Sequence, residues 1–298
     1  MIAETSIKKN KRSLINNAAF SILIPSWNNL SYLKLCIESI HKNSQFAHQI
    51  IVHINEGTDG TLAWIESQPD IDYTFSEKNI GICYALNIAS TLAQTDYIMY
   101  MNDDMYVCPG WDNALMNEIK SINHNNFFLS STMIEPLFTN NNCVIVKNFG
   151  TTINDFKEEE LLKEFSSIQM HDWLGATWPP NIVHKDVWNL VGGYSTEFSP
   201  GMSSDPDFSM KLWKLGIRLY KGVSASRVYH FGCKSTERII KNDGSKMFFK
   251  KWQMPSSTLT KYYLRRGQIF DGALKEPNLP SMLFFKNFFK KLKALFSN

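Results

Sequence analysis

The sequence has few cysteines, and their spacing is unlike that of a crosslinked or zinc-binding protein. The chain contains 5 cysteines in 298 residues. The number is odd, and no two of them form a C-x-x-C pair. This argues against a disulfide framework and a structural zinc site, and it fits a reducing cytoplasm.

Long apolar runs are also missing. No stretch approaches the roughly 18 apolar residues that a membrane-spanning helix needs. A basic cluster occupies residues 8–12, but the apolar stretch after it is broken by Asn16 and Asn17 and ends at Pro25. That pattern is unlike the core of a signal peptide, so we expect a cytoplasmic chain.

The sequence has no strong excess of charge and no repeats. The formal net charge of +3 is too small to predict nucleic-acid binding by itself. No nucleic-acid-binding signature and no internal repeat is visible. A hydrophobic content of 44% and a charged content of 20% are ordinary for a soluble globular protein. A chain of this length can form one large α/β domain or two smaller ones.

Strand-like and helix-like segments alternate in the N-terminal third. Short apolar runs lie at residues 20–25, 49–54, 73–76 and 97–101, and apolar residues at helical spacing lie at 30–40, 62–65 and 82–89. This alternation predicts a mainly parallel sheet with right-handed crossovers. Ligands of such sheets bind at the carboxyl ends of the strands. Residues 26–29, 55–60 and 102–105 follow these ends, so we expect them to line one crevice.

The pattern loosens after residue 123. Strand-like runs occur at 126–136 and 143–150, an acidic helix is expected at 155–165, and "RLYKG" and "SRVYHFG" resemble two short strands. A helix at 205–215 has clear boundaries: Asp205 suits the N-cap, Pro206 the first helical position, and Gly216 the stop.

Two adjacent carboxylates, Asp103 and Asp104, follow the apolar run "YIMYM". Burying acid groups beside such a run costs free energy unless a positive group meets them. From the residues alone, the structural interpretation is a solvated turn, in which Asn-Asp is common.

Several segments together resemble family 2 glycosyltransferases of the GT-A fold. In chain order they are "SILIPSWNN", "IIVHINEGTDGT", "KNIGICYALNIA", "YIMYMNDDMYVCPGW", "GGYSTEFSPGMSSDPDFSMKLWKLG" and "SRVYHFG". The resemblance implies an α/β fold with a Rossmann-like, mainly parallel sheet flanked by helices. It covers residues 20–252, with a nucleotide-sugar-binding half at 20–122 and an acceptor-binding half at 123–252. Residues 1–19 are then a basic extension and 253–298 a helical tail.

The resemblance also implies an activity. Family members take a nucleotide-diphosphate sugar and a divalent metal, Mn²⁺ or Mg²⁺, and transfer the sugar with inversion to a hydroxyl acceptor. The expected acceptor is a glycan or lipid-linked glycan, in surface polysaccharide, lipopolysaccharide or glycoconjugate biosynthesis. A hard cation binds carboxylate and phosphate oxygens and stabilises charge on the leaving diphosphate.

Carried over residue by residue, the resemblance assigns a role to each matching position. Asp104 and His230 would bind the metal, and Asp205 would be the catalytic base. The positions expected at the nucleotide sugar are Pro25, Ser26, Asn28, Asn55, Asn79, Gly81 and Asp103. The positions expected at the acceptor are Trp173, Gly175, Trp178 and Asp207.

Some of these positions carry alternatives, and two depart from the family pattern. Ser204-Asp205 replaces the usual Glu-Asp, and Ile54-Asn55 replaces an acidic pair that contacts the base. Asp205 is equally suited to capping its helix, in which case Asp207 is the alternative base. Structural roles are open for the others: a cap for Asn28, a structural histidine for His230, and core packing for Trp173 and Trp178.

The C-terminal stretch 281–298 has an amphipathic pattern. Large apolar residues share one helical face and lysines the other, which is typical of an interfacial helix and of a terminal helix packed on its domain. The first reading predicts peripheral contact with the inner face of the cell membrane.

Two rival functions are a sugar nucleotidyltransferase and a non-catalytic sugar-binding protein. Nucleotidyltransferases usually have a glycine- and basic-rich loop after the first strand, which "PSWNNLSYLK" lacks. Asp104, Asp205 and His230 together argue against a degenerate site, whereas the changed Ile54-Asn55 pair favours one.

Overall fold

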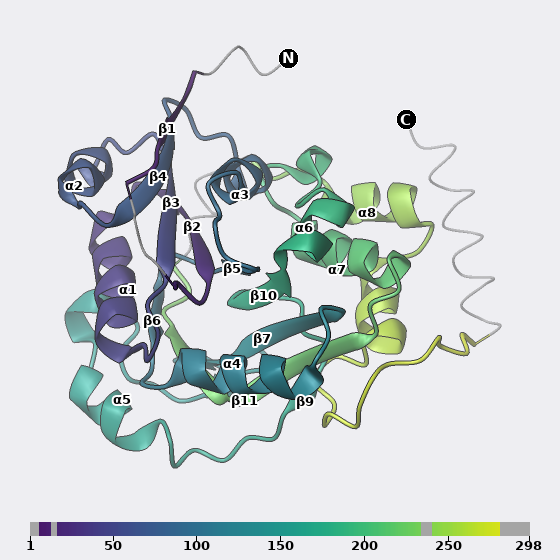
Figure 1. The fold of residues 1–298 in the computed structure, drawn as a ribbon. Helices are drawn as coiled ribbons and strands as arrows, with labels where there is room; N and C mark the ends of the chain where they lie inside the picture. Colours follow the sequence, from purple (N-terminus) through teal and green to yellow (C-terminus); the bar gives the residue numbers. More distant parts are fainter. Residues whose placement is uncertain (1–5, 13–16, 234–239, 281–298) are drawn as a thin grey trace.

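The computed structural model describes residues 6–12, 17–233 and 240–280 (Figure 1). The strands are β1 Ile7–Asn10, β2 Ser21–Trp27, β3 Gln49–Asn55, β4 Ile71–Ser76, β5 Tyr97–Tyr100, β6 Met105–Val107, β7 Phe127–Glu135, β8 Ile145–Val146, β9 Trp173–Leu174, β10 Asn181–His184 and β11 Leu219–His230. The α-helices are α1 Leu30–Asn43, α2 Thr61–Ser67, α3 Ile82–Ser90, α4 Trp111–Ile122, α5 Glu158–Glu164, α6 Lys185–Val191, α7 Ser204–Lys214, α8 Gly244–Trp252 and α9 Ser256–Thr258. Short 3₁₀ turns η1 Ile153–Asp155 and η2 Thr196–Phe198 and the π-turn η4 Leu259–Tyr263 complete the described elements.

One mixed sheet organises the described chain. Its strand order is β1-β4-β3-β2-β5-β10-β7-β11-β6, with β8 on β7 and β9 on β11. Strands β4, β3, β2 and β5 run parallel, as do β7 and β11, while β10 runs antiparallel between β5 and β7. The four expected parallel strands of the N-terminal third are therefore present, close to their expected bounds.

The sheet is covered on both faces. Alternate side chains of a strand point to opposite faces, so Ile22 and Ile24 of β2 pack with α1, α2 and α4, whereas Leu23 packs with α3, α6 and α7. Figure 1 shows α1 and α2 on one side of the N-terminal strands and α3, α6 and α7 on the other. Each fully buried side chain of this size contributes about 1.5–3 kcal/mol through removal from water. This burial on both faces leaves the carboxyl ends of the strands as the open edge.

The packed domain extends beyond both boundaries expected from the sequence. Strand β1 lies within the basic extension 1–19 and pairs antiparallel with β4. At the other end, Leu259, Leu264 and Leu274 are buried in the same core as α7. Residues 253–280 therefore belong to the packed unit. The amphipathic stretch 281–298 lies outside the described residues.

Two local expectations are corrected by the structure. "RLYKG" and "SRVYHFG" belong to one strand, β11, because the register to β7 shifts between Val223 and Arg227 and the strand continues past that irregularity. Helix α7 begins at Ser204, with Ser203 as the N-cap residue, so Asp205 lies in the first turn and does not cap the helix. Within the described ranges, no helix is both long enough and apolar enough to cross a membrane.

Candidate active site

The carboxyl ends of the parallel strands surround a cavity of about 440 Å³, here called the strand-end pocket. Its walls come from the ends of β2 and β3, the segment before α3, the turn between β5 and β6, the start of α7 and the end of β11. The residues discussed below that line it are Pro25, Ser26, Trp27, Asn55, Asn79, Gly81, Tyr100, Asn102, Asp103, Asp104, Asp205 and His230. The crevice expected from the strand order is thus present.

Glu56 joins three loops beside the strand-end pocket. One carboxylate oxygen accepts hydrogen bonds from Trp27 Nε1 at 2.9 Å and Asn28 Nδ2 at 3.3 Å. The other accepts from the backbone N–H of Asn79 at 3.3 Å. Asn28 does not line the pocket; its Oδ1 accepts the N–H of Thr58 at 2.8 Å. Asn28 therefore supports the loop architecture.

The segment before α3 closes one wall of the strand-end pocket. Gly81 has a φ of +77°, and a Cβ added there would lie 2.7 Å from Cα of Pro200. The Ile82 N–H donates to the Pro200 carbonyl at 3.0 Å. Because glycine permits both the positive φ and the close approach, the 199–201 loop comes against α3 and forms part of the wall.

One buried polar atom in the strand-end pocket has no partner among the described residues. Ser26 is 2% exposed, and its hydroxyl makes no hydrogen bond there. An unsatisfied buried hydroxyl costs free energy. The atom is therefore available to a polar ligand that enters the pocket.

Three side chains that are distant in the sequence form a line of ionisable groups. Glu135, at the end of β7, lies with its Oε1 2.8 Å from Nδ1 of His230, and Nε2 of His230 lies 3.5 Å from Oδ1 of Asp104. The second oxygen of Asp104 accepts the Cys233 N–H at 2.6 Å. Burial alone would lower the pKa of His230, but Asp104 and Glu135 outweigh burial and raise it to about 10. Burial works against ionised Asp104, yet His230 and the Cys233 N–H keep its pKa below the ordinary value.

This donor set fits a cation held jointly by protein and ligand. A carboxylate that hydrogen-bonds one ring nitrogen of a histidine and aims the other is the usual support of a metal ligand. Two ligands about 2.1 Å from one ion lie about 3 Å apart, close to the Asp104–His230 separation. No group of three or more His, Cys, Asp or Glu side chains able to hold a metal occurs in the part of the chain that the structure describes. Most of the groups that bind such a cation would therefore come from outside these side chains, from a bound ligand and water.

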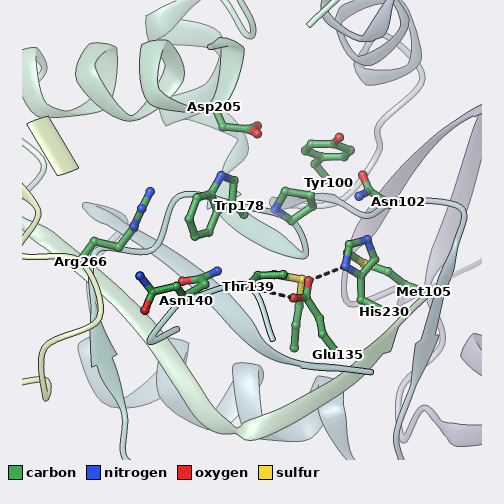
Figure 2. A pocket seen from close by; sticks show the side chains of 13 residues that line it. Tyr100, Asn102, Met105, Glu135, Thr139, Asn140, Trp178, Asp205, His230 and Arg266 are labelled. Carbon is green, nitrogen blue, oxygen red and sulfur yellow. Dashed lines mark hydrogen bonds and ion pairs between the residues drawn. The ribbon is translucent and has the colours of Figure 1, made fainter. Parts of the chain in front are cut away.

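A second cavity of about 450 Å³ adjoins the first; we call it the Trp178 pocket. Trp178, Arg266 and Asp205 line it together with Glu135 and His230, and the labelled side chains converge on one space in Figure 2. Both cavities share the four residues Tyr100, Asn102, Asp205 and His230. The two pockets therefore meet at these residues, Asp205 among them.

Asp205 is a carboxylate in a weakly solvated position. Its Oδ1 accepts a hydrogen bond from the Tyr194 hydroxyl at 3.1 Å. Burial raises the pKa of Asp205 to about 7, with the Tyr194 bond acting in the opposite direction. Burial also raises the pKa of its neighbours Tyr100, Tyr194 and Cys83, so these are neutral at pH 7. A pKa near the working pH is what a general base needs.

A comparison with protein families finds a match in the N-terminal half of the chain. The model of glycosyl transferase family 2 matches residues 21–164. This part of the chain is therefore similar to that family. An uncharacterized glycosyltransferase of Rickettsia bellii (strain RML369-C) is 26% identical over 131 residues, which are 42% of this chain and 18% of the relative.

Solved structures show that the fold is of the GT-A type. S. aureus TarS in complex with UDP has a TM-score of 0.51 at 17% identity, over 71% of this chain and 60% of that one. GalNAc-T7 with UDP, GalNAc and Mn²⁺ has a TM-score of 0.54 at 14% identity, over 82% and 53%. The chain thus spans less than two thirds of the length of each of these three proteins.

The structure brings most of the residues suggested by the family 2 resemblance together. Those that line one or both pockets are Pro25, Ser26, Asn55, Asn79, Gly81, Asp103, Asp104, Trp178, Asp205 and His230. Asp205 and His230 lie beyond the matched residues 21–164, so their placement comes from the structure.

Three residues expected at the acceptor lie elsewhere. Trp173 is 4% exposed and donates from Nε1 to Thr132 Oγ1 at 2.9 Å, so it is a core residue. Asp207 is fully buried, and its Oδ1 accepts from Trp252 Nε1 at 2.8 Å and pairs with Lys251 at 2.9 Å. Asp207 therefore joins α8 to α7. Gly175 is buried and lines neither pocket.

Proposed function

We propose that this chain is an inverting, metal-dependent glycosyltransferase that moves a sugar from a nucleoside diphosphate donor to a hydroxyl acceptor. The observation that carries the proposal is the junction of the two pockets at Asp205. The similarity to family 2 supports the reaction class, and the UDP-bound structural neighbours support a nucleotide-sugar donor.

The donor is assigned to the strand-end pocket. Ser26, Asn55 and Asp103 offer hydroxyl, amide and carboxylate groups to the nucleoside. Asn55 is held in place, because its Oδ1 accepts the Ile80 N–H at 2.9 Å. This arrangement replaces the acidic pair that the resemblance leads one to expect at the base.

The diphosphate is assigned to the end of this pocket where Asp104 and His230 lie. These two residues would hold a divalent cation, Mn²⁺ or Mg²⁺, which when bound offsets the negative charge of the leaving diphosphate. Glu135 fixes His230 by its hydrogen bond to Nδ1 and is a positioning residue. The rest of the cation's ligands would come from phosphate oxygens and water.

The acceptor is assigned to the Trp178 pocket, and Asp205 to the base. Asp205 takes the proton from the acceptor hydroxyl as its oxygen attacks the anomeric carbon from the face opposite the diphosphate. The Tyr194 hydroxyl orients the carboxylate. Since ionised Asp205 is the active form, transfer should rise with pH through about 7.

A thermal-shift screen tests the proposed donor class. UDP, GDP and dTDP are added to the full chain with and without Mn²⁺. A ligand at 100 times its Kd stabilises the native state by about 2.7 kcal/mol, so one nucleotide should raise Tm by several degrees, and only with the metal. If no nucleotide raises Tm in the presence of Mn²⁺, the assignment of the strand-end pocket fails.

We also propose that the acceptor is a cell-envelope glycan and that residues 281–298 hold the enzyme at the membrane surface. The support is the amphipathic pattern of that sequence. The full chain should sediment with anionic vesicles, and a variant lacking 281–298 should not, at similar Tm. Equal sedimentation of both proteins, or of neither, would contradict a membrane role.

A further inference from the structure

Arg266 reaches the Trp178 pocket from a segment that the family match does not include. Its backbone N–H donates to the Thr260 carbonyl at 2.9 Å. The next residues are joined to β9 by two hydrogen bonds, from Gly267 N–H to Leu174 O at 3.0 Å and from Leu174 N–H to Gln268 O at 2.8 Å. The turn that carries Arg266 is therefore fixed to the sheet.

Gly175 makes this approach possible. Its φ is +85°, and a Cβ there would lie 2.7 Å from Cα of Arg266 and 2.9 Å from the Leu264 carbonyl oxygen. Any larger residue would push the turn away from the pocket wall. Gly175 thus affects the Trp178 pocket indirectly, because it allows Arg266 to lie at the pocket wall.

The Arg266 guanidinium has no acidic partner in the described residues. It lies over the Trp178 ring, 4.0 Å from the ring centroid, and no carboxylate of the described ranges lies within ion-pair distance. Arg265 beside it differs, because its guanidinium makes two bonds to Asp271 at 3.1 and 2.9 Å. Burial lowers the pKa of Arg266, but a guanidinium remains charged at neutral pH.

The other charged groups of the pocket do not neutralise Arg266. Glu135 is engaged by His230 at 2.8 Å, and Asp205 by Tyr194 at 3.1 Å. In Figure 2, Arg266 and Asn140 lie on one side of the pocket and Glu135 and His230 on the other. A partly desolvated cation without a counter-charge is costly unless a ligand supplies one.

We infer that Arg266 binds an oxyanion of the acceptor, a phosphate or a carboxylate group, beside the hydroxyl that receives the sugar. The guanidinium fork matches both groups with paired hydrogen bonds. Asn140 adds an amide donor on the same side. Because Arg266 covers one face of Trp178, that face holds the guanidinium and is closed to a stacked sugar ring. The inference rests on the assignment of this pocket to the acceptor.

The test compares three probes of one ring type: glucose 6-phosphate, glucuronate and glucose. Each is titrated into the full chain and followed by ligand-detected NMR. A hydrogen bond to a charged group contributes about 1.5–3 kcal/mol, so wild type should bind a charged probe about 10- to 100-fold more tightly than glucose. The tighter of the two charged probes identifies the oxyanion as phosphate or carboxylate.

Arg266→Gln should abolish this preference, and Lys275→Gln, which removes an exposed charge elsewhere, should preserve it. Asn140→Asp places an acidic partner for Arg266 at an exposed position, so it should weaken the binding of the charged probes. This variant keeps the test decisive if Arg266→Gln folds poorly. Equal binding of all three probes by wild type, or an unchanged preference in both pocket variants, would overturn the inference. A parallel UDP titration with Mn²⁺ separates the two claims: lost UDP binding with a retained Arg266-dependent preference contradicts the proposed function alone.

Discussion

Asp205→Asn should lower the rate of sugar transfer by roughly 10²–10⁴-fold, the usual contribution of a general base. The amide keeps the size of the side chain and still accepts the Tyr194 hydrogen bond, but it cannot take a proton. Nucleotide binding should stay near wild type. The measurement is the single-turnover transfer rate from pH 5.5 to 9, where the rise of the wild-type rate through about pH 7 should disappear in the variant.

The same substitution should stabilise the protein at high pH. The pKa of Asp205 in the folded state, about 7, exceeds the value of about 3.9 in an unfolded chain. Between these values the folded state holds a proton that the unfolded chain has released, so wild-type stability falls as pH rises from about 4 to 7. Asp205→Asn lacks this ionisable group, so its stability does not fall in the same way. At pH 8 its free energy of unfolding should be roughly 1–3 kcal/mol higher than that of the wild type.

Asp207→Asn is the matched control, because both residues lie in the first turns of α7. Its carboxylate bonds Lys251 and Trp252 and lines neither pocket. Loss of these charge-assisted bonds should cost about 1–3 kcal/mol of stability and change transfer only a few-fold. A near-normal rate in Asp205→Asn, or an equal loss of rate in Asp207→Asn, would place the base elsewhere.

Asp104→Asn should remove the metal dependence of nucleotide binding. Asp104 is 4% exposed and faces His230 across the end of the strand-end pocket. Loss of a ligand carboxylate should weaken Mn²⁺-dependent binding by at least ~100-fold, since even supporting residues of metal ligands contribute 10- to 100-fold. The fold should persist, because an amide oxygen can still accept the Cys233 N–H.

Calorimetric titration of UDP, GDP and dTDP, each with and without Mn²⁺, measures this effect. Asp96→Asn is the control, since it changes an exposed aspartate just before the opposite end of β5. The control should bind as wild type does. Unchanged Mn²⁺-dependent affinity in Asp104→Asn would show that the cation, if any, binds elsewhere.

The N-terminal half of the fold could be predicted because its pattern is local. Strands β2, β3 and β5 are short apolar runs bounded by polar turns, and the helices between them keep a 3.6-residue spacing. Parallel pairing then places their carboxyl ends at one edge. The gathering of Ser26, Asn55 and Asp104 follows from topology alone.

The start of α7 shows where local signals mislead. Asp205 before Pro206 has the composition of an N-cap, yet the helix begins at Ser204, two residues before Pro206, and the carboxylate accepts a hydrogen bond from Tyr194. Pro206 is tolerated in the first turn, where the N–H groups have no intrahelical partner. A tertiary hydrogen bond decided the position of the carboxylate, and no local pattern encodes it.

Glu135 and Arg266 differ in how far the sequence could have identified them. Glu135 is the last residue of the buried strand β7, so the rule that polar residues at strand ends line the crevice predicts it. Arg266 depends on the contact of a late turn with Gly175 and on stacking with Trp178. Such a contact between distant segments has no periodic signal.

The most direct test of the central claim is donor turnover by the full chain. UDP-, GDP- and dTDP-sugars are incubated with the protein and Mn²⁺ without acceptor, and the released nucleoside diphosphate is quantified against a chelator control. The account predicts slow release from one nucleotide class, dependent on the metal and lost in Asp104→Asn. Release from none of these donors, or equal release with chelator and in Asp104→Asn, would contradict it.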